Sequence, residues 1–174
     1  MCSLQLPMAM FGPDAEAALV QVVGDVAERS FFAYAERCDV ARFEEAADQV
    51  PRWYCATIRF DEGAAAGMVE CVLPEDLASA LFDAFSGRDA ADPAPEHGQV
   101  ADLIGEFANM ICGAWLTRAA NGQTFTLRPP HVVADHTVRP DLDEATVTLA
   151  VNDRPMAVSV RLSHPDDILT AGVA

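Results

Sequence analysis

Glu106 and Asn109 are the two residues of this sequence whose types and spacing best suit chemistry. They lie three positions apart in a segment, 99–121, that has the periodicity of a helix. Residues three apart on a helix are neighbours on its surface, so the carboxylate and the amide lie side by side. The carboxylate accepts hydrogen bonds and attracts a cation, whereas the amide both accepts and donates and can orient a water molecule. The pair is therefore a candidate for docking and for positioning a water molecule.

The helix that presents this pair is predicted to have two different faces. Its apolar stripe recurs at helical spacing and should be buried: Val100, Leu103, Ile104, Phe107, Ile111 and Ala114. The stripe on the other side is polar: Asp102, Glu106, Asn109, Gly113 and Thr117. Glycine within a helix costs about 1 kcal/mol relative to alanine, and Gly113 leaves a gap where a partner backbone can approach. We therefore expect Asp102 and Gly113 to contact a partner beside the pair.

Composition limits the kinds of partner. The chain has 174 residues, 51% of them hydrophobic, and a formal net charge of −16, with no basic cluster. Binding to nucleic acid needs a positive surface, so the charge argues against that partner. No apolar run approaches the roughly 18 residues of a membrane span, and the N-terminus lacks the charged start of a secretory signal. We expect a protein of the cytoplasm that binds neither nucleic acid nor membrane.

Cysteine and histidine offer little support for a metal site. The five cysteines, an odd number without CxxC spacing, are expected to be mostly buried free thiols in a reducing compartment. His131, Asp135 and His136 are close in sequence but fall at a predicted strand end or loop, where a surface position is the default interpretation. We predict no metal and no cofactor held by this chain.

The order of elements predicts an α/β (α+β) fold. Helices are expected at 14–37, 74–85 and 99–121, with a short helix or a turn at 41–49 and a loop at 86–98. Strands are expected at 53–60 and 67–73, extended segments at 123–128 and 131–134, and a hairpin of strands 144–151 and 156–162 around residues 152–155. We expect one domain over 1–174, with a mixed or antiparallel sheet of about six strands packed by two long helices.

A weak internal repeat organises this prediction. Residues 23–28 (VGDVAE) resemble residues 104–109 (IGEFAN), and each copy lies in a long helix followed by alternating strands. We therefore predict two duplicated helix–strand–strand halves, at about 14–85 and 99–163. In the first copy Asp25 stands at the acidic position but Glu28 stands at the amide position. A carboxylate cannot donate a hydrogen bond, so we expect one functional site.

The segment Glu106-Phe107-Ala108-Asn109, with Gly113 after it, resembles the acid-x-x-Asn signature of the CheC/CheX/FliY family of chemotaxis phosphatases, and its CheX-like members most closely. The order of elements, with residues 129–133 entering a strand, is similar too. The resemblance implies a pseudo-duplicated CheC-like fold. It also implies that the protein hydrolyses the aspartyl-phosphate of a CheY-like response regulator in chemotaxis or another two-component pathway.

The resemblance also implies a role for each residue of the motif. Asn109 would orient the attacking water, and Glu106 would pair with the active-site lysine of the regulator. Mg²⁺ would belong to the regulator and not to this chain. Two alternatives remain open. One is a CheX-like docking domain without catalysis that binds a two-component or flagellar-motor partner; the other is a structural homodimer module in which the motif is incidental.

Overall fold

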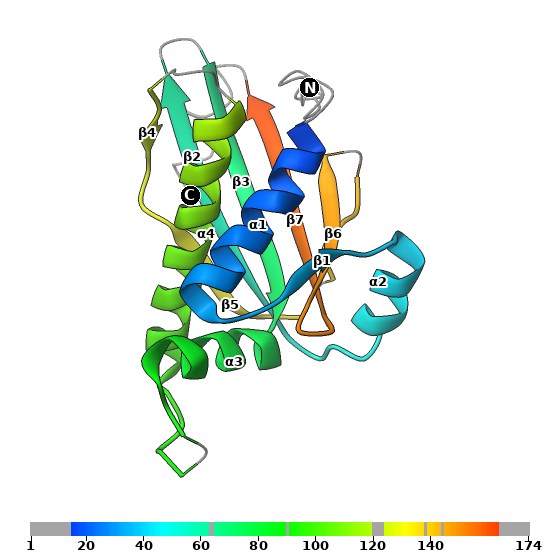
Figure 1. Ribbon diagram of the computed structural model, residues 1–174, viewed down its shortest axis with the longest axis vertical. Coiled ribbons are helices and arrows are strands. Elements are labelled where there is room, and N and C mark those ends of the chain that lie inside the picture. The colour runs from blue at the N-terminus through cyan, green and yellow to red at the C-terminus, as the bar shows by residue number, and fades with distance from the viewer. Residues whose placement is uncertain are drawn as a thin grey trace.

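The computed structural model describes residues 15–62, 65–89, 91–119, 124–137, 139–143 and 145–163. Its helices are α1 (Ala15–Phe31), α2 (Val40–Ala47), α3 (Glu75–Ser86) and α4 (His97–Ala119). Its strands are β1 (Ala35–Arg37), β2 (Trp53–Glu62), β3 (Ala65–Pro74), β4 (Thr126–Leu127), β5 (His131–His136), β6 (Thr146–Val151) and β7 (Arg154–Ser163). These elements form the α+β fold that the sequence predicts (Figure 1).

All strand pairs among the described residues are antiparallel, and they form one sheet in the order β1-β6-β7-β3-β2-β4, with β5 also pairing with β2. The predicted sheet of about six strands is thus confirmed as an antiparallel sheet of seven. Strand residues alternate between two faces, so each strand contributes to two layers. Tyr54, for example, belongs to the main core, whereas its neighbour Trp53 belongs to a smaller cluster.

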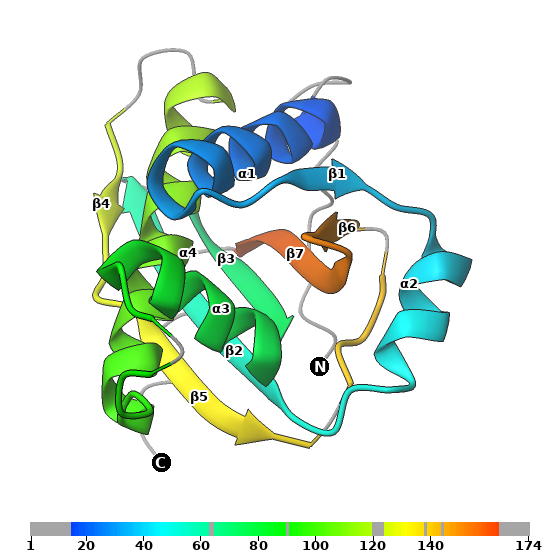
Figure 2. The same ribbon diagram turned by 60° about the horizontal axis from the view of Figure 1, so that its bottom comes forward.

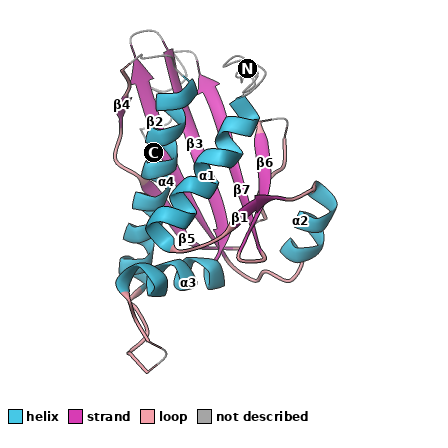
Figure 3. Ribbon diagram, in the orientation of Figure 1, coloured by secondary structure: helices cyan, strands magenta, loops and turns pink. Residues whose placement is uncertain are grey.

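The helices cover the two faces unequally. The long helices α1 and α4 cross one face, with α3 at the end of the sheet below them (Figures 1 and 3). The large core lies between these helices and the sheet, and its biggest side chains include Phe31, Phe60, Phe107 and Trp115. On the opposite face the short helix α2 buries Phe43 against Trp53, with ring centroids 6.3 Å apart. Helix α4 therefore lies over the larger of the two cores, and its polar side faces away from that core.

The strand order has the symmetry that a duplicated chain would produce. Each side of the sheet has an edge strand followed by the two strands of a long hairpin. The order is β1-β6-β7 on one side and β5-β2-β3 on the other. Each edge strand follows a long helix in sequence and pairs with the hairpin of the other half. The topology supports the interpretation as two repeats, which stays a prediction.

The first helix is shorter than the sequence predicts. It ends at Phe31, not at residue 37, and residues 35–37 form the edge strand β1 instead. Phe32 adopts a left-handed conformation with φ of 52°, and the Ala33 N–H donates to the Ala27 carbonyl at 3.0 Å. A residue in the left-handed conformation is a common way to end a helix, and the residue is usually glycine. Since no glycine stands here, the sequence did not indicate where the helix ends. Tyr34, which the sequence predicts to lie within the helix, is exposed on the connection to β1.

Other boundaries agree within a few residues. The predicted hairpin is confirmed, with Asn152 and Asp153 at positive φ, as a two-residue hairpin turn requires. Strand β7 begins at Arg154, two residues before the predicted start, because the turn is that tight. The predicted first residue of the first helix, residue 14, and the predicted last residues of the last helix, 120–121, lie outside the described residues.

Gly67 gives a direct test of how β2, β3 and β7 pack. A Cβ atom there would lie 2.5 Å from Phe60 Cζ and 2.6 Å from the Arg161 carbonyl oxygen, closer than atoms can approach. Gly67→Ala should lower the free energy of unfolding by about 2 kcal/mol or more, as overpacking does. The control is Gly98→Ala, where no neighbouring atom lies within 4 Å. Urea denaturation of both variants measures the difference; equal stabilities would contradict this packing.

Candidate functional site

The site is built on α4, which is held in place along its whole length. Its predicted apolar stripe is buried, apart from the half-buried Ala114. Phe107 packs edge-on against Phe31 of α1, with ring centroids 4.8 Å apart. Near the end of the helix the Trp115 indole N–H donates to the Ala15 carbonyl at 3.3 Å. These contacts fix the rotation of α4 and so determine which side chains face outward.

The outward side of α4 is the polar stripe that the sequence predicts. Asp102 and Glu106 are exposed, whereas Asn109 and Gly113 are half-buried. Within the described part of the chain, the side chains of Asp102, Glu106 and Asn109 form no hydrogen bond or ion pair. The carboxylates and the amide are thus available to a partner molecule.

An open groove of about 800 Å³ lies beside the first turns of this stripe. Two of the predicted residues, Asp102 and Glu106, line it. Its other lining residues come from α3, α4, β5 and the segment leading into β5: Phe82, Phe85, Ser86, Gln99, Ala101, Leu103, Gly105, Pro130 and Val132. Asn109 and Gly113 do not line the groove, so the structure places the predicted residues in two adjoining parts, an acid-lined groove and a helical turn beyond it.

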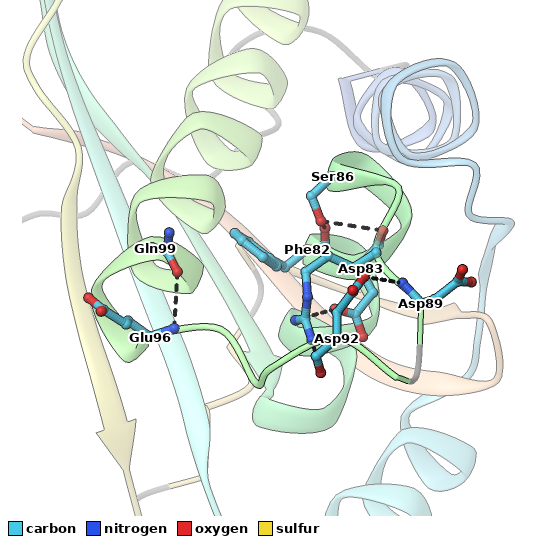
Figure 4. Close-up of polar contacts among 8 residues, drawn as sticks. Phe82, Asp83, Ser86, Asp89, Asp92, Glu96 and Gln99 are labelled. Carbon is cyan, nitrogen blue, oxygen red and sulfur yellow. Dashed lines mark hydrogen bonds and ion pairs between the residues drawn. The ribbon is translucent and has the colours of Figure 1, made fainter.

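The wall of the groove that α3 provides is held by Arg88, a residue that the sequence analysis did not single out. The Arg88 guanidinium donates to Asp83 at 2.8 Å and to the Asp92 carbonyl at 3.3 Å, and it lies 6.0 Å from the centre of the Phe82 ring (Figure 4). The Asp89 N–H donates to the Asp92 carboxylate at 2.8 Å. The connection between α3 and α4, which was expected to be a loop, is therefore held by hydrogen bonds around Arg88.

Gly105 is a second residue that the sequence analysis missed. A Cβ atom there would lie 3.1 Å from the Pro130 ring and 3.3 Å from Val132, so α4 and the entry to β5 are in close contact at this glycine. The signal was present in the repeat, because Gly24 occupies the same place in the first copy. There a Cβ would lie 3.7 Å from the Ala35 carbonyl of β1. In each half a glycine before the acid lies against the edge strand that follows its helix.

Asp25, the acid of the first copy of the repeat, forms an ion pair within the protein. Asp25 accepts a hydrogen bond from Arg118 of α4 at 2.6 Å, and both side chains are partly exposed. This ion pair ties α1 to α4. Such a surface pair contributes about 1 kcal/mol at most. Glu28, at the amide position, is exposed.

Nucleophilic and metal chemistry receive no support from the described residues. Cys38, Cys55, Cys71 and Cys112 are free. Burial raises the pKa of Cys55 and of Cys112 to about 12, and that of Cys71 well above its ordinary value, so these thiols are protonated near neutral pH. Among the described residues no group of three potential ligands could hold a metal ion. His131 is exposed, and the side chains of Asp135 and His136 lie outside the description.

Comparison with known proteins identifies the family. Residues 54–152 match the family described as chemotaxis phosphatase CheX. CheX from Vibrio vulnificus superposes with a TM-score of 0.67 at 16% identity, covering 91% of this chain and 99% of that one. CheX from Desulfovibrio desulfuricans gives 0.64 at 18% identity, covering 86% and 99%. No curated protein matches the sequence.

A third similar structure is CheX of Borrelia burgdorferi in a CheX–CheY–BeF₃–Mg²⁺ complex, with a TM-score of 0.58 at 12% identity, covering 87% of this chain and 99% of that one. At these identities the likeness to solved structures shows the fold, whereas the match to the family covers more than half of the chain. The protein belongs to the CheX family of chemotaxis proteins. In the described part of the chain, every helix is too short or too polar to cross a membrane.

Two of the three glycines of α4, Gly105 and Gly113, should respond differently to alanine. At Gly113 the added Cβ would lie 3.8 Å from Leu127, an ordinary contact, so Gly113→Ala should gain the helix propensity of about 1 kcal/mol. At Gly105 the crowding against Pro130 and Val132 opposes that gain. We expect Gly105→Ala to be less stable than Gly113→Ala by about 1 kcal/mol or more in urea denaturation. Similar stabilities would show that α4 and β5 can separate freely.

Proposed function

We propose that this protein accelerates the hydrolysis of the aspartyl-phosphate of a CheY-like response regulator. The observation that supports this most directly is the pair Glu106 and Asn109. Both face outward from a helix that is anchored on its other side, and neither side chain has a partner among the described residues. The CheX family match supports a role in chemotaxis, and the complex of a similar fold with CheY supports the kind of partner.

The chemistry requires little from this chain besides positioning. A water molecule attacks the phosphorus in line, the bond between phosphorus and the aspartate oxygen breaks, and a carboxylate and inorganic phosphate are released. In phosphoryl transfer of this kind, catalysis is almost entirely positioning and charge stabilisation. The Asn109 amide oxygen accepts a hydrogen bond from the water and holds it in line, while the amide NH₂ remains free to donate. Mg²⁺ on the regulator would neutralise the phosphoryl oxygens.

Glu106 serves to align the two proteins. It lies one turn before Asn109 on the exposed stripe, and its carboxylate would meet a lysine at the active site of the regulator. Asp102, one turn further back, adds a second acid on the same side, and Gly113 leaves the turn beyond Asn109 uncrowded. The proposal places the protein in the cytoplasm, where response regulators are phosphorylated.

Asn109→Ala tests the catalytic step. The variant should lose the acceleration of phosphate release from a CheY-like regulator phosphorylated with acetyl phosphate, because no group then orients the water. Its affinity for the beryllofluoride-activated regulator should change by less than about threefold, since only one small polar contact is removed. The rate of hydrolysis is measured from the inorganic phosphate released, and the affinity is measured by fluorescence titration.

The matched control is Glu28→Ala, at the corresponding position of α1, which should keep full activity. If the wild-type protein binds the activated regulator but does not change the rate of phosphate release, the docking domain without catalysis is the correct alternative. If Asn109→Ala retains wild-type acceleration, the water-positioning role is wrong.

Glu106→Lys tests alignment. Reversing the charge replaces attraction to a lysine by repulsion in a contact from which water is partly excluded, so affinity for the activated regulator should fall by about tenfold or more. Glu28→Lys produces the same change in net charge on the other long helix and should leave affinity within about twofold. Equal affinities of the two lysine variants would mean that only the overall charge matters.

A further inference from the structure

Three aromatic side chains are exposed on the connection from α1 to β1 and at the end of α3. Phe32 is 79% exposed, Tyr34 is 69% exposed and Phe85 is 57% exposed. Phe32 and Tyr34 belong to the short connection between α1 and β1, and Phe85 belongs to the last turn of α3. Exposed aromatic residues that gather in one region mark interaction sites more often than single ones do.

Phe32 is exposed in a conformation that disfavours it. Its φ of 52° belongs to the left-handed region, where glycine is at ease and a bulky side chain is strained. The position is the helix-ending one that glycine fills most often. The ring gains almost no burial in return, since 79% of the residue remains accessible. Within the monomer, then, phenylalanine is a poorer choice than glycine at this position.

Phe85 connects this strained position to the groove of the functional site. Its ring lies 5.6 Å from the ring of Phe31, the residue just before Phe32, and Phe85 also lines the groove with Asp102 and Glu106. The end of α1 lies next to α3 when the molecule is viewed from below (Figure 2). Phe85 therefore lies between the end of α1, where Phe32 is exposed, and the acid-lined groove.

We propose that Phe32 and Phe85 extend the docking surface of Asp102 and Glu106 for the response regulator, and that this extension takes apolar side chains flanked by lysine or arginine. This rests on the proposed function for the identity of the partner. Charge complementarity supports that occupant, because the groove holds two acids and the whole chain has a net charge of −16. A second copy of this chain fits less well, since a symmetric contact across the groove would bring acids against acids.

Phe32→Gly separates docking from folding. Removing the strain should raise the melting temperature by about 2–4 °C, while loss of the aromatic contact should weaken binding to the beryllofluoride-activated regulator by about tenfold. At saturating phosphorylated regulator the rate of phosphate release should equal that of the wild type, with the KM raised in proportion. Phe32→Asn, which also tolerates the left-handed conformation, should behave in the same way.

The control is Val40→Ala, because Val40 is 51% exposed on α2, the helix on the opposite face of the sheet. It should not change affinity. A Phe32→Gly protein that is more stable yet binds as tightly as the wild type would overturn the proposal. So would a wild-type protein that binds no activated regulator, or a wild-type dimer in gel filtration that Phe32→Gly dissociates. If Phe32→Gly weakens binding but the wild type never accelerates phosphate release, the docking surface stands and the phosphatase function fails.

Discussion

The packing of one face of α4 against α1 and the sheet is the constraint on which the candidate site depends. Phe107 against Phe31 holds the middle of the helix, the Trp115 hydrogen bond holds its end, and the contact of Gly105 with Pro130 sets its distance from the edge of the sheet. A helix fixed at three points cannot rotate to hide Glu106 and Asn109. Glu106 and Asn109 face outward together because burial of the opposite face of α4 allows the helix only one orientation about its axis.

The two long helices share a pattern but serve different purposes. In α1 the acid at the repeat position, Asp25, is paired with Arg118, so it strengthens the contact between the helices instead of facing a partner. In α4 the acid at the equivalent position, Glu106, is exposed without a partner among the described residues. Asp25 of α1 therefore helps to hold α4 in place, in keeping with the prediction of one functional site in a chain with two repeats.

How much could be predicted from the sequence depends on how far apart the interacting residues are. The faces of α4, the antiparallel sheet and the hairpin at Asn152 follow from periodicities and turn residues within a few positions. The Asp25–Arg118 pair joins residues 93 positions apart, and Gly105 meets Pro130 across a loop, so neither has a local signal. The end of α1 was missed for another reason: the backbone reverses at a phenylalanine, which local preference would not select.

The exposed Phe32 at the end of α1 has a physical consequence for recognition. With a net charge of −16, the protein gains nothing from long-range attraction to an acidic partner, and selectivity must come from short-range contacts. An exposed acid selects only for positive charge, which many proteins offer. In the proposed docking surface, the exposed aromatic ring of Phe32 adds a requirement for shape and apolar area to the requirement for positive charge. Fewer proteins satisfy both requirements than satisfy one, so this ring would increase selectivity at the cost of backbone strain at Phe32.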